Sequence, residues 1–237
     1  MSSSEFVLYV EIFSSTITVL SIIVAIIAFV HQKHRELKVS AIKAGMNIEQ
    51  VVIQWTYIDM VLKESFPKEY EMLCKNSREK MNLFESSEIE NVFSSNQITI
   101  IRKMFGVNKY NSSTIGAPQI VFRVTRKSVE NANKCFPKMI LDVVGNTDIT
   151  RYEQIFHRVL IDTLNKLETI CAMIELNVAD ERTVFTLIGN SFCGFIGTMY
   201  YFISSVNESN AAGKKKLQHI IKTFNKWNRK LSKQKNN

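Results

Sequence analysis

A chain of 237 residues has room for one ordinary domain and an anchor, and this length argues against two large domains. Eight glycines and three prolines are too few for a turn-rich sheet protein and favour helices. The net charge is +8, but residues 209–237 hold nine Lys or Arg and no acid, which leaves 21 basic and 22 acidic residues elsewhere. The body is therefore nearly neutral, and the tail carries the charge.

The four cysteines lie far apart and form no C-x-x-C pair: Cys74, Cys135, Cys171 and Cys193. Such spacing indicates neither a disulfide framework nor a zinc site. We expect buried free thiols in a reducing compartment.

The first predicted element is a membrane anchor at Ile12–Val30, a run of 19 residues without charge. As a helix it is just long enough to cross a hydrocarbon core of about 30 Å. The segment before it contains acids and no Lys or Arg, unlike a signal peptide. The basic residues that follow it, Lys33, Arg35 and Lys38, predict an uncleaved anchor in the cell inner (cytoplasmic) membrane, with the N-terminus outside and the rest in the cytoplasm.

Beyond the anchor, apolar residues between 48 and 62 recur near helical spacing and stop before Pro67. Residues 69–105 then predict two or three short helices. Their acid-rich turn is expected to be a solvated face: Glu85, Glu88 and Glu90.

Residues 106–147 are the least regular part of the sequence. We expect a loop here, with one alternating stretch at Val121–Thr125 that fits a short strand. A long helix is predicted at 148–177, where Thr150 and Glu153 form a capping-box pattern ahead of an apolar stripe.

The next helix is predicted to run from about Asp180 to Val206 and has no charged residue after Thr183. Two interpretations remain open: a buried core helix, or a second span at 184–206. Polar and small residues favour the core helix, and a second span would place the basic tail outside the cell.

The tail at 209–237 predicts a basic amphipathic helix whose apolar stripe is Leu217, Ile220, Ile221, Phe224, Trp227 and Leu231. Three interpretations stay open. The stripe packs on the body and leaves the lysines in solvent, or the helix lies on a bilayer with Trp227 and Phe224 at the headgroups. The third is nucleic-acid binding, for which no recognition motif is present.

The candidate lipid contacts are therefore the basic residues after the anchor together with residues of the tail helix. These are Lys33, Arg35, Lys38, Lys214, Lys215, Lys216, Lys222, Lys226, Trp227, Arg229 and Lys230. The expected partners are anionic lipid, and an unidentified protein or a second copy of the chain.

No motif for catalysis, metal binding or a cofactor occurs. His31 and His34 are three residues apart but lack a third ligand nearby, and no G-x-S-x-G, H-E-x-x-H or G-K-[ST] pattern is present. We therefore predict no enzyme, cofactor or metal.

Three segments of the chain resemble an uncharacterised bacterial family of proteins with one N-terminal span and a cytoplasmic helical domain. They are RVLIDTLNKLETICAMIELNVADERTV, YYFISSV and FNKW. The residues that carry the resemblance are Leu164, Asn165, Leu167, Glu168, Glu181, Tyr201 and Trp227. The resemblance implies a membrane-tethered bundle, and some short anchored families look like parts of phage-defence or toxin modules.

Asn165 and Glu168 lie three residues apart beside the apolar stripe of the long helix. We expect them to pair this helix with the next one, through Arg182 or Tyr201, in a structural role.

The sequence thus predicts an all-α fold: a transmembrane helix at 1–31, a cytoplasmic helical bundle with an irregular middle insertion at 32–208, and a basic amphipathic C-terminal helix and tail at 209–237. The predicted function is a membrane-anchored interaction module. The alternative is a membrane-perturbing effector of a bacterial phage-defence or toxin system.

Overall fold

The computed structural model describes residue 32 and residues 48–76, 78–108, 119–144, 152–208 and 217–235. Several predicted features lie outside these residues: the anchor, Lys33, Arg35, Lys38, the capping residue Thr150, and Lys214, Lys215 and Lys216. The described part is mostly helical, which confirms the all-α class. Within it, no helix is both long enough and apolar enough to cross a membrane.

Residues 48–65 are helical (helix 48–65). The chain continues through α2 (Pro67–Lys75), the 3₁₀ helix η1 (Arg78–Lys80), α3 (Ser86–Val92), α4 (Ser95–Arg102) and the strands β1 (Phe105–Asn108) and β2 (Gln119–Phe122). The second half comprises α5 (Arg126–Cys135), α6 (Pro137–Val144), α7 (Tyr152–Glu175), α8 (Glu181–Thr198), α9 (Tyr200–Glu208) and α10 (Gln218–Lys235).

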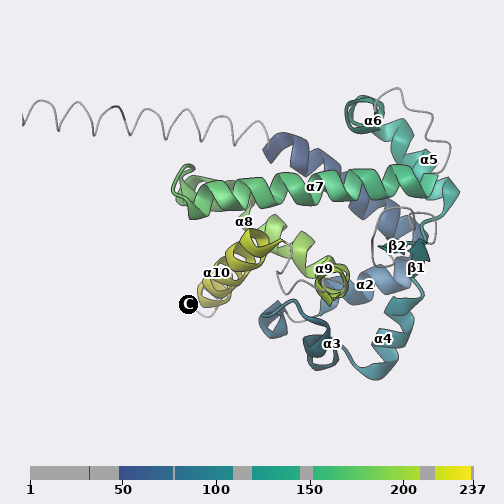
Figure 1. Cartoon of the computed structure of the whole chain (residues 1–237), viewed down its shortest axis with the longest axis horizontal. Coiled ribbons are helices and arrows are strands. Elements are labelled where there is room, and N and C mark those ends of the chain that lie inside the picture. The colour runs from purple at the N-terminus through teal and green to yellow at the C-terminus, as the bar shows by residue number, and fades with distance from the viewer. Residues whose placement is uncertain are drawn as a thin grey trace, which may run out of the picture.

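The long helix α7 lies lengthwise across the molecule, with α5 and α6 near its N-terminal end and α8 and α10 near its C-terminal half (Figure 1). Helix 48–65, purple to blue in Figure 1, runs in the direction opposite to α7. The Gln54 amide connects the two helices, because Nε2 donates to Asp162 Oδ2 at 2.7 Å and Oε1 accepts from Thr163 Oγ1 at 3.3 Å.

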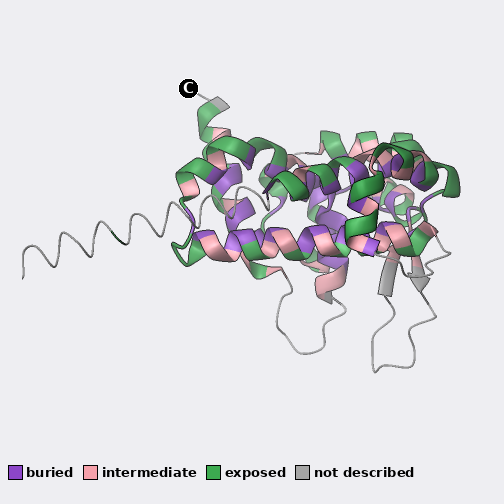
Figure 2. Ribbon diagram, turned by 90° about the horizontal axis from the view of Figure 1, so that it is seen from above, coloured by how far each residue is buried: buried purple, intermediate pink, exposed green. Residues whose placement is uncertain are grey.

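One hydrophobic core extends from helix 48–65 to α10. Buried residues recur along the inner side of α7 (purple in Figure 2) and match the predicted stripe: Phe156, Val159, Leu160, Leu164, Leu167, Ile170, Cys171 and Ile174. The helical period of these residues places them on one face, so this helix could be predicted from its pattern alone.

The middle of the chain is more regular than expected. β1 and β2 pair antiparallel, with Phe105 opposite Phe122, and α5 and α6 follow where only a loop and one strand were expected. The side chain of Thr125 caps α5, and Pro137 is the first residue of α6, a position where its missing N–H costs nothing. α5 buries only Ser128, Val129 and Ala132, and a helix this short and polar is hard to tell from a loop in the sequence.

The apolar segment 184–206 is divided between α8 and α9 at Met199; α9 is largely buried in the body, and α8 buries one side. This arrangement is the one that the core-helix interpretation of the segment predicted. Of the cysteines, Cys171 and Cys193 are buried, but Cys74 and Cys135 are exposed, so the expectation of buried thiols was wrong for these two.

The acid-rich turn is not wholly a solvated face, because Glu88 is only 8% exposed. Its carboxylate accepts the backbone N–H of Leu83 at 2.7 Å and of Phe84 at 3.2 Å, and the hydroxyl of Tyr200 at 2.6 Å. Asn82 N–H lies 3.2 Å from the same carboxylate. Phe84 has a positive φ of 53°, so Glu88 holds a loop that bends sharply around it and fastens that loop to α9.

We expect Glu88→Ala to lower the free energy of unfolding by about 3 kcal/mol, because it leaves several buried donors without an acceptor. The measurement is denaturant unfolding of the full chain followed by fluorescence, since Trp55 and Trp227 are both buried. The matched control is Glu90→Ala on the same helix, where the side chain is exposed and the expected change is within about 0.5 kcal/mol. Equal losses in the two variants would contradict this role for Glu88.

Candidate functional site

The C-terminal helix α10 packs its apolar stripe against α7 and α8. Ile220, Ile221, Phe224 and Trp227 are all buried, and Leu217 and Leu231 are half-buried against the core. The first interpretation of the tail therefore describes α10. A headgroup position for Trp227 and Phe224 was wrong, because both are at most 1% exposed.

Trp227 is the centre of this contact. Its ring meets Phe185 and Phe192 of α8 edge-on, with centroids 5.4 and 5.1 Å away, and its Nε1 donates to Glu181 Oε1 at 3.1 Å. Burial of a side chain of this size contributes on the order of 2–3 kcal/mol, and the aromatic geometry adds to it. The contact settles which face of α10 turns outward.

Glu168 of α7 caps the start of α10. Its carboxylate accepts the backbone N–H of His219 at 3.0 Å and of Ile220 at 2.9 Å. A carboxylate suits this position, because it supplies acceptors to unpaired N–H groups at the positive end of the helix dipole. Glu168 thus pairs two helices as predicted, but with α10 and not through Arg182 or Tyr201, whereas Asn165 is exposed on the outer side of α7.

Two further acids, Glu175 at the end of α7 and Glu181 at the start of α8, bind α10 on either side of the α7–α8 turn. Glu175 lies 2.6 Å from Lys222 Nζ and 2.5 Å from His219 Nδ1, and Glu181 lies 2.5 Å from Lys226 Nζ. Hydrogen bonds from Lys222 and then His219 hold the pKa of Glu175 below its usual range. Partial burial by itself would raise the pKa of Glu181, but the hydrogen bonds from Lys226 and Trp227 outweigh it and the pKa lies below the usual range.

The turn between these acids is itself well ordered by hydrogen bonds. Val178 N–H and Ala179 N–H both donate to Met173 O, at 2.8 and 3.1 Å, and Asn177 takes a positive φ of 55°. The Asp180 side chain then caps α8 by accepting Thr183 N–H at 2.9 Å. We refer to residues 175–182 as the α7–α8 corner.

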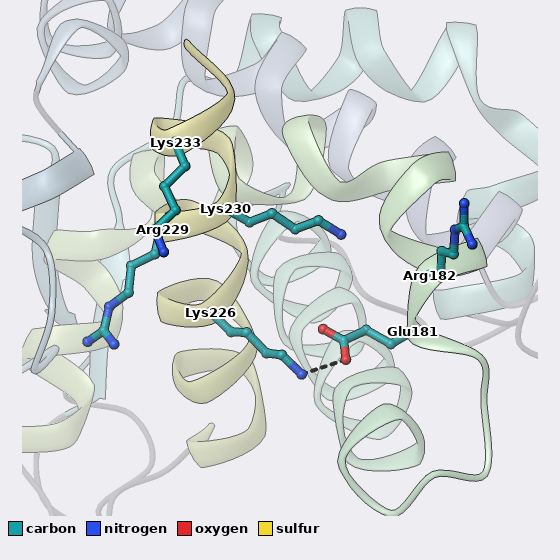
Figure 3. A pocket seen from close by; sticks show the side chains of 6 residues that line it. All are labelled: Glu181, Arg182, Lys226, Arg229, Lys230 and Lys233. Atoms are coloured by element: carbon teal, nitrogen blue, oxygen red, sulfur yellow. Dashed lines mark hydrogen bonds and ion pairs between the residues drawn. The ribbon is translucent and has the colours of Figure 1, made fainter. Parts of the chain in front are cut away.

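Beside this corner, α8 and α10 enclose an open groove of about 520 Å³. Five cations and one acid line it: Glu181, Arg182, Lys226, Arg229, Lys230 and Lys233. Figure 3 shows Lys226 and Lys230 reaching from α10 towards α8, while Arg182 and Arg229 point away on the two sides. Lys230 Nζ lies 3.8 Å from the centroid of the Phe185 ring, and Phe185 in turn lies over Gly189, where a Cβ would come within 2.6 Å of it.

The structure brings four of the predicted lipid contacts together on the outer face of α10, namely Lys222, Lys226, Arg229 and Lys230, all of them exposed. Sequence reasoning missed Arg182, Lys233 and the two acids of the corner as parts of this surface. The sequence does contain a hint of this pairing. Glu175 and Glu181 lie on either side of a predicted turn, and Lys222 and Lys226 are one helical turn apart. Two acids and two bases at matching spacing could have been expected to pair.

Two partly buried titratable groups of the described residues lie away from this corner. Burial raises the pKa of Asp59 to about 6, although its hydrogen bond with Tyr70 opposes the rise, and burial lowers the pKa of His157. In the part of the chain that the structure describes, no three His, Cys, Asp or Glu side chains come together so as to hold a metal ion.

No protein-family model matches this chain, and no curated protein and no solved structure matches it. The resemblance to a family of anchored helical proteins therefore stays a prediction. What the fold and the site define is an all-α body with a fixed basic face beside a hydrogen-bonded corner.

We expect Glu168→Ala to lower the free energy of unfolding by about 1–2 kcal/mol, because α10 loses the acceptor at its start. Amide hydrogen exchange should show the loss most clearly in the first turn of α10. The control is Asn165→Ala, an exposed position one turn earlier on α7, where both quantities should stay at the wild-type values. Unchanged exchange in Glu168→Ala would show that the cap does not stabilise α10.

The lowered pKa of Glu175 predicts how stability depends on pH. Its pKa in the folded state lies below the ordinary value of 4.5, so its contribution is present above that value and is lost as the pH falls through the folded-state pKa. Glu175→Gln should have a lower Tm than the wild type at neutral pH, and the difference should shrink on acidification. Glu90→Gln, an exposed acid on α3, should keep the wild-type pH dependence. A difference in Tm that does not change with pH would contradict the ion pairs.

Proposed function

We propose that this protein is a membrane-tethered helical interaction module, held at the cytoplasmic face of the inner membrane by residues 12–30. The observation that carries the proposal is the orientation of α10, with its apolar side inward and its basic side outward. Its apolar stripe is used within the core, while Arg229, Lys230 and Lys233 remain exposed on one fixed surface. The body thus presents positive charge that a membrane tether would bring to the lipid.

The charge suits an anionic leaflet. Each Lys or Arg close to such a surface contributes about 1 kcal/mol, and the attraction falls off over roughly a Debye length of 8–10 Å at physiological salt. Several cations on a rigid face add their contributions without first ordering a flexible tail. The basic residues that follow the anchor, among them Lys33 and Arg35, would add to the same attraction.

Four acids of the described body have structural roles. Glu88 holds a loop, Glu168 caps α10, and Glu175 and Glu181 fasten α10 to the corner. Each of these carboxylates is used to hold the fold together. At the membrane the module would bind a protein partner or a second copy of the chain.

We expect the full chain to stay in the membrane fraction after an alkaline carbonate wash. Leu20→Lys combined with Val24→Lys should release it, because each charge at the centre of a span costs about 2.5–3.5 kcal/mol on insertion scales. A reporter at the C-terminus should be cytoplasmic in the wild type.

The control for this experiment is Leu20→Ile combined with Val24→Ile, which keeps the segment apolar and should remain in the membrane. Release of the wild-type chain by the carbonate wash would refute the tether. A C-terminal reporter found outside the cell would refute the proposed orientation.

A further inference from the structure

We propose that the α7–α8 corner is a second contact with the bilayer, in which Leu176 and Val178 enter the headgroup region of an anionic leaflet and Arg182, Lys230 and Lys233 bind lipid phosphates. The proposal rests on the membrane tether proposed above and names the surface that the tethered body turns to the lipid.

The apolar part of this surface is the tip of the corner. Leu176 is 70% exposed, the largest exposed fraction among the large apolar residues that the structure describes as exposed, and Val178 is 39% exposed on the same turn. Exposed apolar side chains scattered singly over a surface are ordinary. Here two of them stand on one projecting turn, directly between two acids that bind α10.

The corner can present these side chains because it is rigid. Hydrogen bonds from Leu176 N–H to Ala172 O at 2.9 Å and from Val178 N–H to Met173 O hold the turn from within. Glu175 and Glu181 hold it from both sides through Lys222 and Lys226. A preorganised turn loses little conformational entropy when it enters an interface.

The charges next to the tip complement an anionic surface. The groove beside the corner carries five cations and one acid, and that acid, Glu181, is already paired with Lys226. Arg182 follows Glu181 in the first turn of α8, and Lys230 and Lys233 lie further along the groove on α10. An exposed apolar tip at one end of a basic groove is a combination that suits an interfacial lipid contact.

The corner lies near the start of helix 48–65, to which the proposed tether connects. Gln54 is level with Asp162 and Thr163, and helix 48–65 is antiparallel to α7. At about 1.5 Å per residue, Ile48 is therefore level with about residue 168 of α7, and Leu176 extends about 12 Å further in the same direction. The 17 residues between the predicted anchor and Ile48 reach at most about 60 Å, so the body stays close to the membrane.

The same features favour lipid over a soluble phosphate compound or a protein. A free phosphate compound would bind the cations but gain nothing from Leu176 and Val178. A partner helix would find no apolar residue in the groove, because every residue that lines it in the described structure carries a charged group. Two apolar side chains bury less than a single acyl chain, which by itself gives only marginal binding. The contact would therefore orient a body that is already tethered, where the local concentration is high.

The experiment places one tryptophan at the tip. The full chain carrying Leu176→Trp is reconstituted into phosphatidylcholine vesicles with or without phosphatidylglycerol, using acyl chains labelled with bromine, which quenches tryptophan at close range. The control is Leu141→Trp on α6, at the other end of α7, where Leu141 is similarly exposed at 61%. The two native tryptophans are buried, and the wild-type signal is subtracted.

We expect blue-shifted and quenched emission from Leu176→Trp in vesicles with phosphatidylglycerol, and neither effect from Leu141→Trp. Adding Lys230→Glu and Lys233→Glu to Leu176→Trp should abolish the quenching, as should high salt. Equal quenching at both positions, or none at Leu176→Trp, would overturn the proposal.

A carbonate wash of the same vesicles separates this proposal from the tether. A chain that resists the wash but shows no quenching at the tip keeps its tether and loses the corner contact. A chain that washes off, yet is quenched at low salt, loses the tether and keeps the corner contact. If it washes off and is not quenched, both proposals fail.

Discussion

The burial of Trp227 between α8 and α10 is the contact on which the basic surface depends, because it orients the helix that carries Lys226, Arg229 and Lys230. An amphipathic helix has two ways to hide its apolar stripe: in a bilayer or in a core. Here the stripe completes the core, so the exposed face of α10 carries its cations. The cations of α10 are therefore held in position by the fold itself. They differ in this from the cations of an amphipathic helix that folds only on contact with a bilayer.

Carboxylates arrange the rest of the molecule around that contact. Glu168 fixes where α10 starts, and Glu175 and Glu181 hold the turn between α7 and α8 against it. Inside the body, Glu88 accepts hydrogen bonds from three backbone N–H groups and from the Tyr200 hydroxyl. Glu168 and Glu88 in particular accept backbone N–H groups, at the start of a helix and in a bent loop, that have no partner within regular secondary structure.

Parts of this arrangement could be read from the residues and parts could not. The stripe of α7 was predicted because a long run with a 3.6-residue period leaves little ambiguity. α5 was missed because its ten residues are mostly polar, and only three of them are buried. Glu88 was assigned to a solvated face because nothing in its neighbours shows that the preceding loop folds back over it. Glu168 was recognised as a helix-pairing residue, but its partner is 51 residues away in α10, a distance over which local patterns carry no information.

The sequence by itself determined the class of the protein: a helical body, a basic tail with one apolar stripe, and an uncharged run of 19 residues near the N-terminus. These depend on composition and short-range periodicity, which a linear chain displays directly. Only the tertiary structure decided that Trp227 faces the core and that the turn after Glu175 is held against α10 by the Glu175–Lys222 ion pair. Residues 175 and 222 are far apart along the chain, and only the packing of α7 against α10 brings them together.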